Sequence, residues 1–258
     1  MKYAITIAGF DNSGGAGTAA DLRTFSAYGL CGLSVITSIV PQSPKEVCPV
    51  IPLPVKDIQE QFLSIKDFPA HVCKVGLLPT QEIVECVSEL IKGRKAVVDP
   101  IIWAGTGATL VSKDMLKALV SSLLPRAFVA TPNVPEAELI SGMKINDIES
   151  QKKASEIIHD IGPKHVVIKG GHLSGTDVLY DGKKFEFFTS EYLKTDRVHG
   201  TGCTYSSSIC AQLSLGANVK TACANAKEFA LMSIKHALSV KGGKFANQAW
   251  GWKEVIKN

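Results

Sequence analysis

The sequence predicts an α/β protein with a central, mainly parallel sheet and helices on both of its faces. Short apolar runs of strand length alternate with longer segments of helical periodicity along most of the chain, which is the pattern of successive β-α-β units. No internal repeat and no low-complexity linker interrupts this alternation. We therefore expect one domain over residues 1–258, with ligands bound beyond the carboxyl ends of the strands.

The expected strands are apolar and are bounded by turn or loop residues. The first covers residues 3–9 and is followed by a flexible glycine-rich turn at residues 14–17. Residues 176–190 resemble a hairpin with Asp181–Gly182 at its turn. The remaining strands are expected at residues 33–40, 71–76, 95–101, 127–133 and 165–171.

The expected helices begin or end at residues with known terminal preferences. The first helix ends at Gly29, Ser112 caps a helix that reaches residue 123, and Pro135 suits the first turn of a short helix. A glycine-rich loop is expected at residues 103–109. Further helices are expected at residues 56–66, 80–92, 147–161 and 219–240, and one more ends at Gly216.

Composition excludes several classes of protein. Twenty-eight basic and 24 acidic side chains give a net charge of only +4, and no basic cluster with interleaved aromatics predicts nucleic-acid binding. No apolar run approaches the roughly 20 residues of a membrane span, and the first residues lack a signal-peptide pattern. The seven cysteines contain no C-x-x-C pair, which favours a reduced, cytoplasmic protein. Together with the charge and the lack of a membrane span, the composition predicts neither membrane nor nucleic-acid partners.

Several common catalytic motifs are missing from the sequence. There is no G-x-x-x-x-G-K-[ST] loop, and no G-x-G-x-x-G opens a helix after the first strand. H-E-x-x-H and G-x-S-x-G are also absent. These absences disfavour a P-loop protein, a dinucleotide-binding fold and two classes of hydrolase.

Residues 197–216, RVHGTGCTYSSSICAQLSLG, carry the strongest functional signal. Gly200 and Gly202 bracket Thr201 and lead directly into a helical segment, whose first amides lack intrahelical partners. Such donors, together with the helix dipole, suit an anion and above all a phosphate. Cys203 lies in the first turn, where the same field is expected to favour the thiolate. The alternative is a glycine turn that only starts a packed helix, with Cys203 as a small apolar side chain.

Acidic and basic residues follow several of the other strands. Asp99 and Glu136 offer the carboxylate oxygens that a Mg²⁺-nucleotide needs, and Lys169 closes an apolar strand where its cation could meet phosphate. Each has a structural alternative. Asp99 could be a turn aspartate, Glu136 could be a glutamate stabilised at a helix N-terminus, and Lys169 could be a lysine that only snorkels at a strand end. Asp21 could hold a substrate hydroxyl or ring nitrogen or lie on a solvated helix face, and we expect His199 to be a structural hydrogen-bonding residue.

The candidate residues lie within five motifs, which occur along the chain in this order: AGFDNSGGAGTAADL, VDPIIWAGTG, TPNVPEAELISG, VVIKGGH and HGTGCTYSSSICAQLSLG. Together they resemble the hydroxymethylpyrimidine/phosphomethylpyrimidine kinases of thiamine biosynthesis, within the ribokinase-like superfamily. The resemblance runs from about residue 3 to at least residue 239, and its first and last motifs are the specific ones. It implies a single ribokinase-like domain that uses ATP and Mg²⁺ to phosphorylate 4-amino-5-hydroxymethyl-2-methylpyrimidine and then its monophosphate. It also implies a homodimer.

The resemblance assigns roles to individual positions. Gly200, Thr201 and Gly202 match the family's anion hole, and Cys203 matches its catalytic residue, where most ribokinase-like enzymes have an aspartate. Positions that match the pyrimidine pocket are Gly9, Ala16, Asp21, Gln42, Leu77 and Ile101. Positions that match the nucleotide region are Asn133, Glu136 and Lys169, with Asp99 and Glu136 at the metal.

Three departures from the family pattern lie on the expected substrate side. Phe10 stands where serine or threonine is usual, the segment IVPQSPKEV keeps Gln42 but adds two prolines, and Leu77 replaces a common methionine. Substrate choice therefore has alternatives: a pyridoxal (vitamin B6) kinase, or a non-catalytic sensor of the phosphorylated pyrimidine. A sensor could dispense with the base and nucleotide positions, whereas this sequence retains them.

Overall fold

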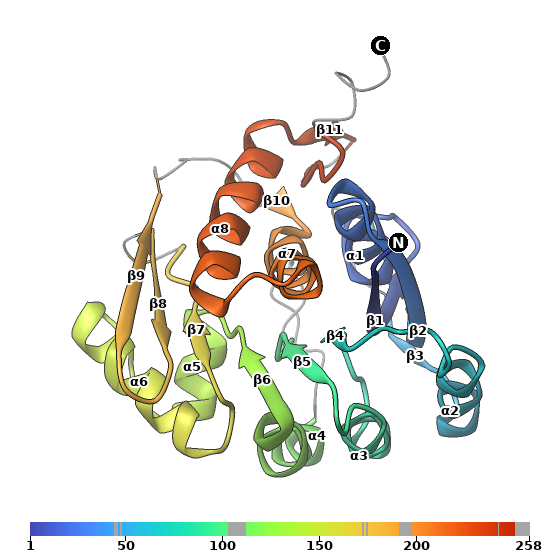
Figure 1. Ribbon diagram of the computed structural model, residues 1–258, viewed down its shortest axis with the longest axis horizontal. Coiled ribbons are helices and arrows are strands. Elements are labelled where there is room, and N and C mark those ends of the chain that lie inside the picture. Colours follow the sequence, from blue (N-terminus) through green and yellow to red (C-terminus); the bar gives the residue numbers. More distant parts are fainter. Residues whose placement is uncertain are drawn as a thin grey trace.

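The structure is a computed structural model that describes residues 1–43, 46, 48–102, 112–171, 173, 175–190, 198–241 and 243–250. Within these residues a large sheet runs through the middle of the molecule, with helices on both faces (Figure 1). The predicted fold class is confirmed. None of the described helices combines the length and the apolar character needed to cross a bilayer.

The central sheet joins most of the described strands. Their bounds are β1 Tyr3–Asp11, β2 Cys31–Val40, β3 Ile51–Pro52, β4 Val72–Val75, β5 Lys95–Val98, β6 Ala127–Ala130, β7 Val166–Ile168, β8 Thr176–Tyr180 and β9 Phe185–Thr189. The order across the sheet is β3-β2-β1-β4-β5-β6-β7-β8-β9. The strands from β2 to β7 in this order are parallel, and β3, β8 and β9 pair antiparallel at the two edges. The expected hairpin over residues 176–190 is therefore β8 and β9.

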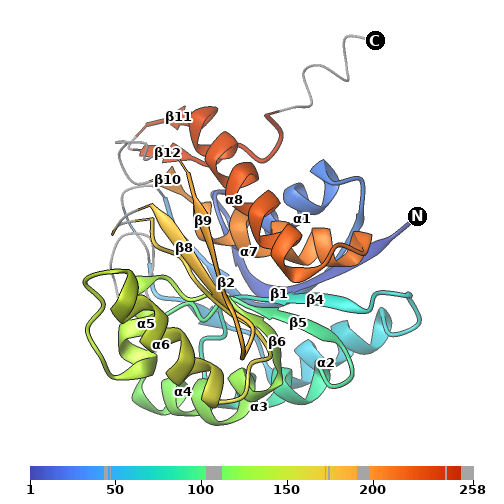
Figure 2. The ribbon, with the colours of Figure 1, turned by 60° about the vertical axis from the view of Figure 1, so that its left-hand side comes forward.

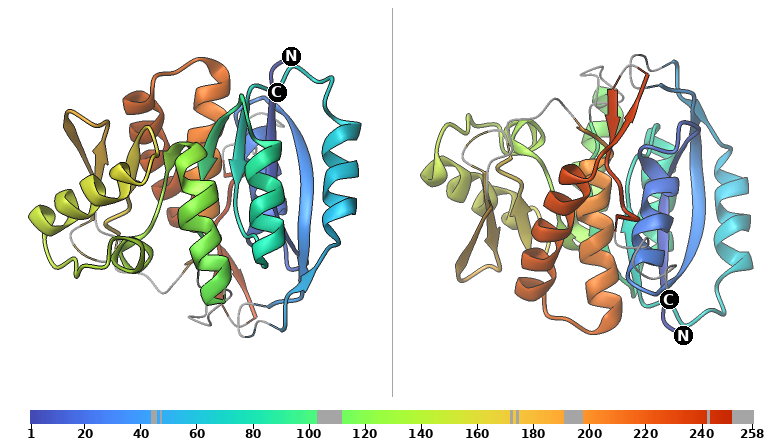
Figure 3. Two further views of the ribbon diagram at one scale, coloured as in Figure 1. Left: turned by 90° about the horizontal axis from the view of Figure 1, so that it is seen from below. Right: turned by 90° about the horizontal axis from the view of Figure 1, so that it is seen from above.

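Helices cover the two faces of the sheet in separate layers. One face carries α1 Gly17–Ala27, α7 Thr201–Leu215 and α8 Val219–Lys235 (Figure 2). The other face carries α2 Val55–Ser64, α3 Gln81–Leu90, α4 Lys113–Ala118, α5 Val134–Ser141 and α6 Ile148–Asp160. Figure 3 shows these two layers from opposite sides of the molecule.

The uninterrupted apolar character of the strands follows from this double cover. Ile5 and Ile7 on β1 are fully buried in the core beneath α2 and α3, whereas Ala4 belongs to the core beneath α1, α7 and α8. Side chains alternate between faces along a strand, so a strand covered on both faces must be apolar at successive positions. Burying one such large side chain stabilises the fold by about 1.5–3 kcal/mol.

Helix termini are set by capping side chains and by glycine, of which Ser112 and Gly216 were predicted from the sequence. Side chains of Ser112, Asn133 and Asn218 accept hydrogen bonds from the third helical residue at the start of α4, α5 and α8. Gly216 ends α7 in the left-handed conformation, with φ of 101°. These caps satisfy backbone groups that a helix end would otherwise leave without partners.

Two helix boundaries differ from the prediction. The helix capped by Ser112 is α-helical only to Ala118, continues as a π-helical segment η1 (Leu119–Leu123) and ends in a 3-10 turn η2 (Leu124–Arg126). Pro125 explains the loosening, because a proline donates no amide hydrogen bond and its ring crowds the carbonyl four residues earlier. The glycine-rich loop expected at residues 103–109 lies outside the described residues.

The helix expected to reach residue 240 ends instead at Lys235. The residues beyond it form strand β11 (Leu238–Val240), which pairs antiparallel with β12 (Gly243–Phe245). β12 pairs in parallel with β10 (Val198–His199), and these three strands make a second, small sheet that the sequence did not reveal. Trp250 packs with its ring centroid 5.9 Å from that of His236, and Trp252 lies outside the described residues.

Candidate active site

The predicted nucleotide-side residues gather at the carboxyl edge of the parallel sheet. Asp99 directly follows β5, Asn133 follows β6 and Lys169 follows β7. Asn133 and Lys169 form an isolated parallel bridge that holds the two strand ends together. The first turn of α7 reaches the same place, because a methyl group added at Gly202 would lie 3.7 Å from Lys169 Nζ and 3.8 Å from Asp99 Oδ2.

The turn before α7 leaves the start of this helix without a side-chain cap. Gly200 occupies the N-cap position with φ of 88° and no side-chain hydrogen bond. A methyl group at this position would lie 1.9 Å from the carbonyl oxygen of Gly15, so both the backbone angle and the close approach require glycine. Thr201 Oγ1 donates to the carbonyl of Val198 at 2.9 Å and does not cap the helix. The first amides of α7 therefore form a donor set suited to an anion.

Cys203 lies in this first turn and is buried, with 6% of its surface exposed. Burial raises the pKa of its thiol to about 11, although the nearby Lys74 cation and a contact with the Gly17 amide act in the opposite direction. The expectation that the helix terminus would favour the thiolate is therefore wrong for the resting protein. Loss of hydration outweighs the helix field at this depth.

Asp99 and Lys169 form an ion pair in which Asp99 is buried and Lys169 is partly exposed. Lys169 Nζ lies 2.7 Å from Asp99 Oδ1, and the same oxygen accepts a hydrogen bond from Thr131 at 3.1 Å. Ser206 on α7 donates to Asp99 Oδ2 at 3.2 Å. Burial lowers the pKa of Lys169, but the carboxylates of Asp99 and Glu136 outweigh it and the net shift is upward. A turn aspartate at position 99 and a snorkelling lysine at position 169 would not account for this ion pair and these hydrogen bonds.

Glu136 takes part in the N-terminal cap of α5, which is the structural role given above as its alternative. Its carboxylate also lies within the electrostatic reach of Lys169 and Asp99. Its carboxylate accepts from the Asn133 amide at 2.9 Å while Asn133 Oδ1 accepts from the Glu136 amide at 2.9 Å, which is a capping box. Burial and the nearby charge of Asp99 raise the pKa of Glu136 to about 7, against the opposing effect of Lys169. Two buried carboxylates and one ammonium thus lie close together.

Asp21 on α1 is fully buried, so the solvated-face alternative is wrong. Its Oδ2 accepts from Thr6 Oγ1 at 2.6 Å and from Lys74 Nζ at 2.9 Å, and Lys74 is itself fully buried on β4. Burial raises the pKa of Asp21 despite this partner, and the pKa of Lys74 is raised because Asp21, Cys203 and Asp99 outweigh its own burial. Asp21 Oδ1 has no described hydrogen-bond partner.

Sequence reasoning missed Lys74. The one available signal was a lysine inside the apolar strand HVCKVG, because a buried lysine requires a counter-charge. Nothing in the sequence identified Asp21, which lies 53 positions earlier, as that counter-charge.

The substrate-side positions also meet near the end of β1. A methyl group added at Gly9 would lie 2.7 Å from Ser38 Oγ and 3.4 Å from Leu77 Cδ2, so these side chains pack closely against the Gly9 backbone and leave no room for a Cβ atom. The Ala16 amide donates to Asp11 Oδ2 at 2.8 Å. These contacts place Gly9, Ala16 and Leu77 around one strand end.

The other two substrate-side positions are tied to the same edge through neighbours. The Gln42 amide donates to Asn12 Oδ1 at 2.8 Å, which links it to the turn after β1. The Ile101 amide donates to the carbonyl of Asp99 at 2.8 Å, and its side chain is half-buried. His199 Nε2 lies 2.9 Å from Asp11 Oδ2, in keeping with the structural role expected for it.

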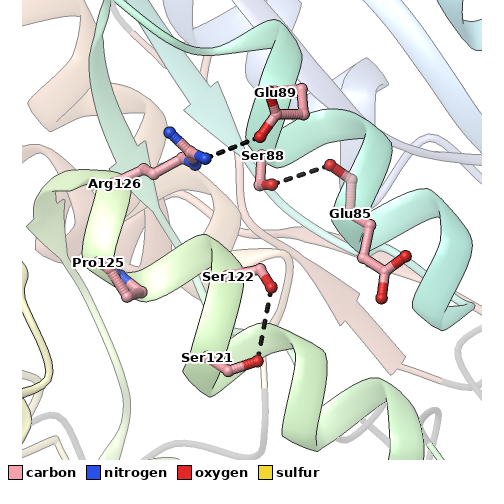
Figure 4. A pocket seen from close by; sticks show the side chains of 7 residues that line it. All are labelled: Glu85, Ser88, Glu89, Ser121, Ser122, Pro125 and Arg126. Atoms are coloured by element: carbon pink, nitrogen blue, oxygen red, sulfur yellow. Dashed lines mark hydrogen bonds and ion pairs between the residues drawn. The ribbon is translucent and has the colours of Figure 1, made fainter.

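A separate pocket of about 390 Å³ lies between α3 and the segment η1–η2 (Figure 4). Residues 124–126 lead directly into β6, and the end of α3 leads towards β5, so this pocket is at the amino edge of the sheet. The side chains that line it are Glu85, Ser88, Glu89, Ser121, Ser122, Pro125 and Arg126. It includes none of the predicted site residues.

Comparisons with known proteins agree with this geometry. The profile of the phosphomethylpyrimidine kinase family matches residues 11–248. A hydroxymethylpyrimidine/phosphomethylpyrimidine kinase of Aquifex aeolicus is 40% identical over 247 residues, covering 93% of this chain and 97% of that protein. Among solved structures, a pyridoxal kinase of Bacillus subtilis in complex with ADP superposes with a TM-score of 0.90 at 36% identity, covering 96% and 98% of the two chains. A phosphomethylpyrimidine kinase of Clostridium difficile superposes with a TM-score of 0.82 at 38% identity, covering 91% and 100%.

Proposed function

This chain belongs to the phosphomethylpyrimidine kinase family, and from that premise we propose that it phosphorylates 4-amino-5-hydroxymethyl-2-methylpyrimidine and then its monophosphate, in thiamine biosynthesis, with ATP as donor. The observation that carries the proposal is the uncapped first turn of α7, which faces Lys169 and Asp99 across Gly202. Phosphoryl transfer depends mainly on positioning and on neutralising charge, and this arrangement offers both.

The amides at Gly200, Thr201, Gly202 and Cys203 stabilise the charge of the transferring phosphoryl group. They are held in place before the substrate binds, because the Gly200 turn is fixed against the Gly15 carbonyl. Donors that need no rearrangement contribute most to lowering a charged transition state. Lys169 adds a cation on the same side, and the Asn133 cap keeps the neighbouring strand ends in register.

Cys203 accepts the proton of the substrate hydroxyl while the hydroxyl oxygen bonds to the γ-phosphorus and the bond to the β-phosphate oxygen breaks. The thiolate is the form that can take this proton, and burial makes it the minor form at neutral pH. Lys74 lies close enough to favour the thiolate electrostatically. The base is therefore present in a small fraction of resting molecules, a fraction that grows with pH.

The residues on the nucleotide side fit a Mg²⁺ ion. Asp99 and Glu136 are buried carboxylates, and the charge of Asp99 opposes the ionisation of Glu136, a repulsion that a divalent cation would relieve. The described residues include no cluster of three His, Cys, Asp or Glu side chains, so the protein alone does not form a closed cage. This donor set is typical of Mg²⁺ held by one or two carboxylates, water and phosphate oxygens. When bound, the ion neutralises phosphate charge.

The substrate positions define the acceptor side of the site. Gly9, Ala16 and Leu77 lie near the end of β1, Gln42 contacts the turn after it, and Ile101 follows β5. Asp21 acts electrostatically on Cys203 and has one carboxylate oxygen without a described partner. A hydrogen-bond donor on the pyrimidine would satisfy that oxygen. The homodimer implied by the family resemblance and the cytoplasmic location favoured by the sequence stay predictions.

Pyridoxal is the second candidate acceptor, because solved pyridoxal kinases share this fold closely. Both rings carry a hydroxymethyl group, but pyridoxal offers only one useful phosphorylation. The purified protein should be assayed for ADP release with the pyrimidine alcohol, its monophosphate and pyridoxal, with Mg²⁺ present or chelated. We expect turnover of both pyrimidines and formation of the diphosphate. Turnover of pyridoxal alone would reassign the substrate, and no turnover of any acceptor would refute the kinase.

A further inference from the structure

The C-terminal segment, residues 243–248, lies against both glycine-rich turns of the candidate site. Strand β12 pairs with β10, and the Ala246 amide donates to the His199 carbonyl at 3.0 Å. Further on, the Asn247 amide donates to the Ser233 carbonyl of α8 at 3.0 Å. The segment is thus fixed to the residues immediately before the phosphate-facing turn.

Gln248 ends this segment and is almost completely buried, with 2% of its surface exposed. Its Oε1 accepts from Arg23 Nε at 3.0 Å, and its Nε2 donates to Thr204 Oγ1 at 2.8 Å. Each of these partners also contacts one glycine turn. The Arg23 guanidinium donates to the Gly14 carbonyl, and Thr204 Oγ1 donates to the Gly200 carbonyl at 2.8 Å.

A continuous chain of hydrogen bonds therefore runs from the turn after β1 to the start of α7. It passes from Gly14 through Arg23, Gln248 and Thr204 to Gly200. The amide of Gln248 is suited to the middle position because it accepts on one side and donates on the other. Leaving either neighbour unpaired would cost free energy, since the groups are buried.

We propose that Gln248 is a positioning residue for phosphoryl transfer, because it holds Thr204, and through it the Gly200 carbonyl, in the orientation that aims the first amides of α7 at the transferring phosphate. This inference rests on the proposed kinase function of the same site. Gln248 touches neither acceptor nor nucleotide; it acts through Thr204. A group that matters only in the transition state affects kcat more than KM.

The test compares Gln248→Leu, Thr204→Val and the double variant with the wild-type enzyme. We expect each single change to lower kcat about tenfold or more while both KM values stay within about threefold, because displacing a transition-state donor should cost less than the roughly 10²–10³ in kcat that deleting one costs. The double variant should lose little more than the worse single variant, because both changes break one chain of contacts. Additive losses, or a rise in KM alone, would overturn the proposal.

Gln248→Glu is the second variant, for the case in which Gln248→Leu does not fold. A carboxylate keeps an acceptor for Arg23 but cannot donate to Thr204. We expect it to behave like Thr204→Val; full activity would overturn the role of the donated bond. Gln81→Leu is the matched control, since Gln81 is an exposed glutamine on α3 that donates to Glu85 at 2.8 Å, and the activity of this variant should equal that of the wild type.

Hydrogen exchange separates this proposal from the kinase assignment. The Thr204 amide donates to the Gly200 carbonyl at 2.9 Å, so loosening the turn should speed exchange in peptides covering residues 200–206. Peptides covering β5 should be unchanged. Faster exchange throughout the protein would indicate a merely structural role and overturn the proposal. If the wild-type protein phosphorylates no acceptor, the kinase assignment fails, and a local change in exchange still decides whether Gln248 orders the turn.

Discussion

Lys74 and Asp21 form an ion pair with 2.9 Å between Nζ and Oδ2, and neither side chain is exposed to solvent. The pair lies within the electrostatic reach of Cys203 on α7, since both charges act on the thiol. Burying an ion pair usually gives little net stability, but removing one partner leaves a buried charge without compensation. A pair of this kind within the electrostatic reach of a proposed base is more readily explained by its effect on that base than by stability.

Lys74→Met should therefore destabilise the protein strongly. We expect a loss of about 3–5 kcal/mol in the free energy of unfolding, because Asp21 would be left buried without its cation. The double variant Lys74→Met/Asp21→Asn should recover more than half of that loss. Urea unfolding followed by fluorescence measures both. Lys56→Met is the control: Lys56 is exposed and 3.7 Å from Glu60, so its unfolding midpoint should not move. Equal midpoints for Lys74→Met and wild type would contradict the burial of this pair.

Cys203→Ala should abolish most of the turnover. Losing a group that acts only in the transition state costs on the order of 10²–10³ in kcat, and removal of the base should cost at least that. Binding of the pyrimidine, measured by calorimetry, should change little. Cys210→Ala, on the same helix and equally buried in the core beneath α7, should keep its kcat. A Cys203→Ala enzyme with nearly normal turnover would remove the cysteine from the mechanism.

Much of the fold was predictable because its signals are local. Successive apolar strands and capped helices depend on neighbouring residues: Ser112 caps its helix and Gly216 ends α7 as the pattern indicated. The meeting of Asp99 and Lys169 was also predictable, since each follows a parallel strand and the carboxyl ends of such strands meet at one edge.

The remaining features depend on contacts between distant positions. The partner of Lys74 is 53 positions away, and Gln248 meets Arg23 across 225 positions. The pairing of β10 with β12 joins two very short segments that carry no strand pattern. The raised pKa of Cys203 depends on its depth, whereas the sequence showed only its place at a helix terminus. Burial and long-range pairing are the quantities that a single sequence does not contain.

The dependence of activity on pH should follow the Cys203 thiol. Its pKa is raised to about 11, so the thiolate fraction grows about tenfold for each pH unit between pH 7 and pH 9. The thiolate is the active form, and kcat/KM should therefore rise with pH over this range. The residual activity of Cys203→Ala should lack this rise. A plateau of kcat/KM below pH 9 in the wild-type enzyme would contradict a Cys203 pKa of about 11 in the free enzyme, because kcat/KM reports the free enzyme.

Gly202→Ala should block catalysis without harming the fold. The added methyl group would meet the protein only at ordinary contact distances, 3.7 Å from Lys169 Nζ and 3.8 Å from Asp99 Oδ2. Alanine also has a helix propensity up to about 1 kcal/mol better than glycine, so the melting temperature should stay the same or rise. The methyl group would nevertheless fill space that the transferring phosphate needs, and kcat/KM should fall about 10²-fold or more, as for the loss of an anion-hole donor. Gly200→Ala provides the contrast, because φ of 88° and the 1.9 Å approach to the Gly15 carbonyl should lower stability as well as activity. If Gly202→Ala turned over normally with a normal melting temperature, the phosphate would have to bind elsewhere than at the start of α7.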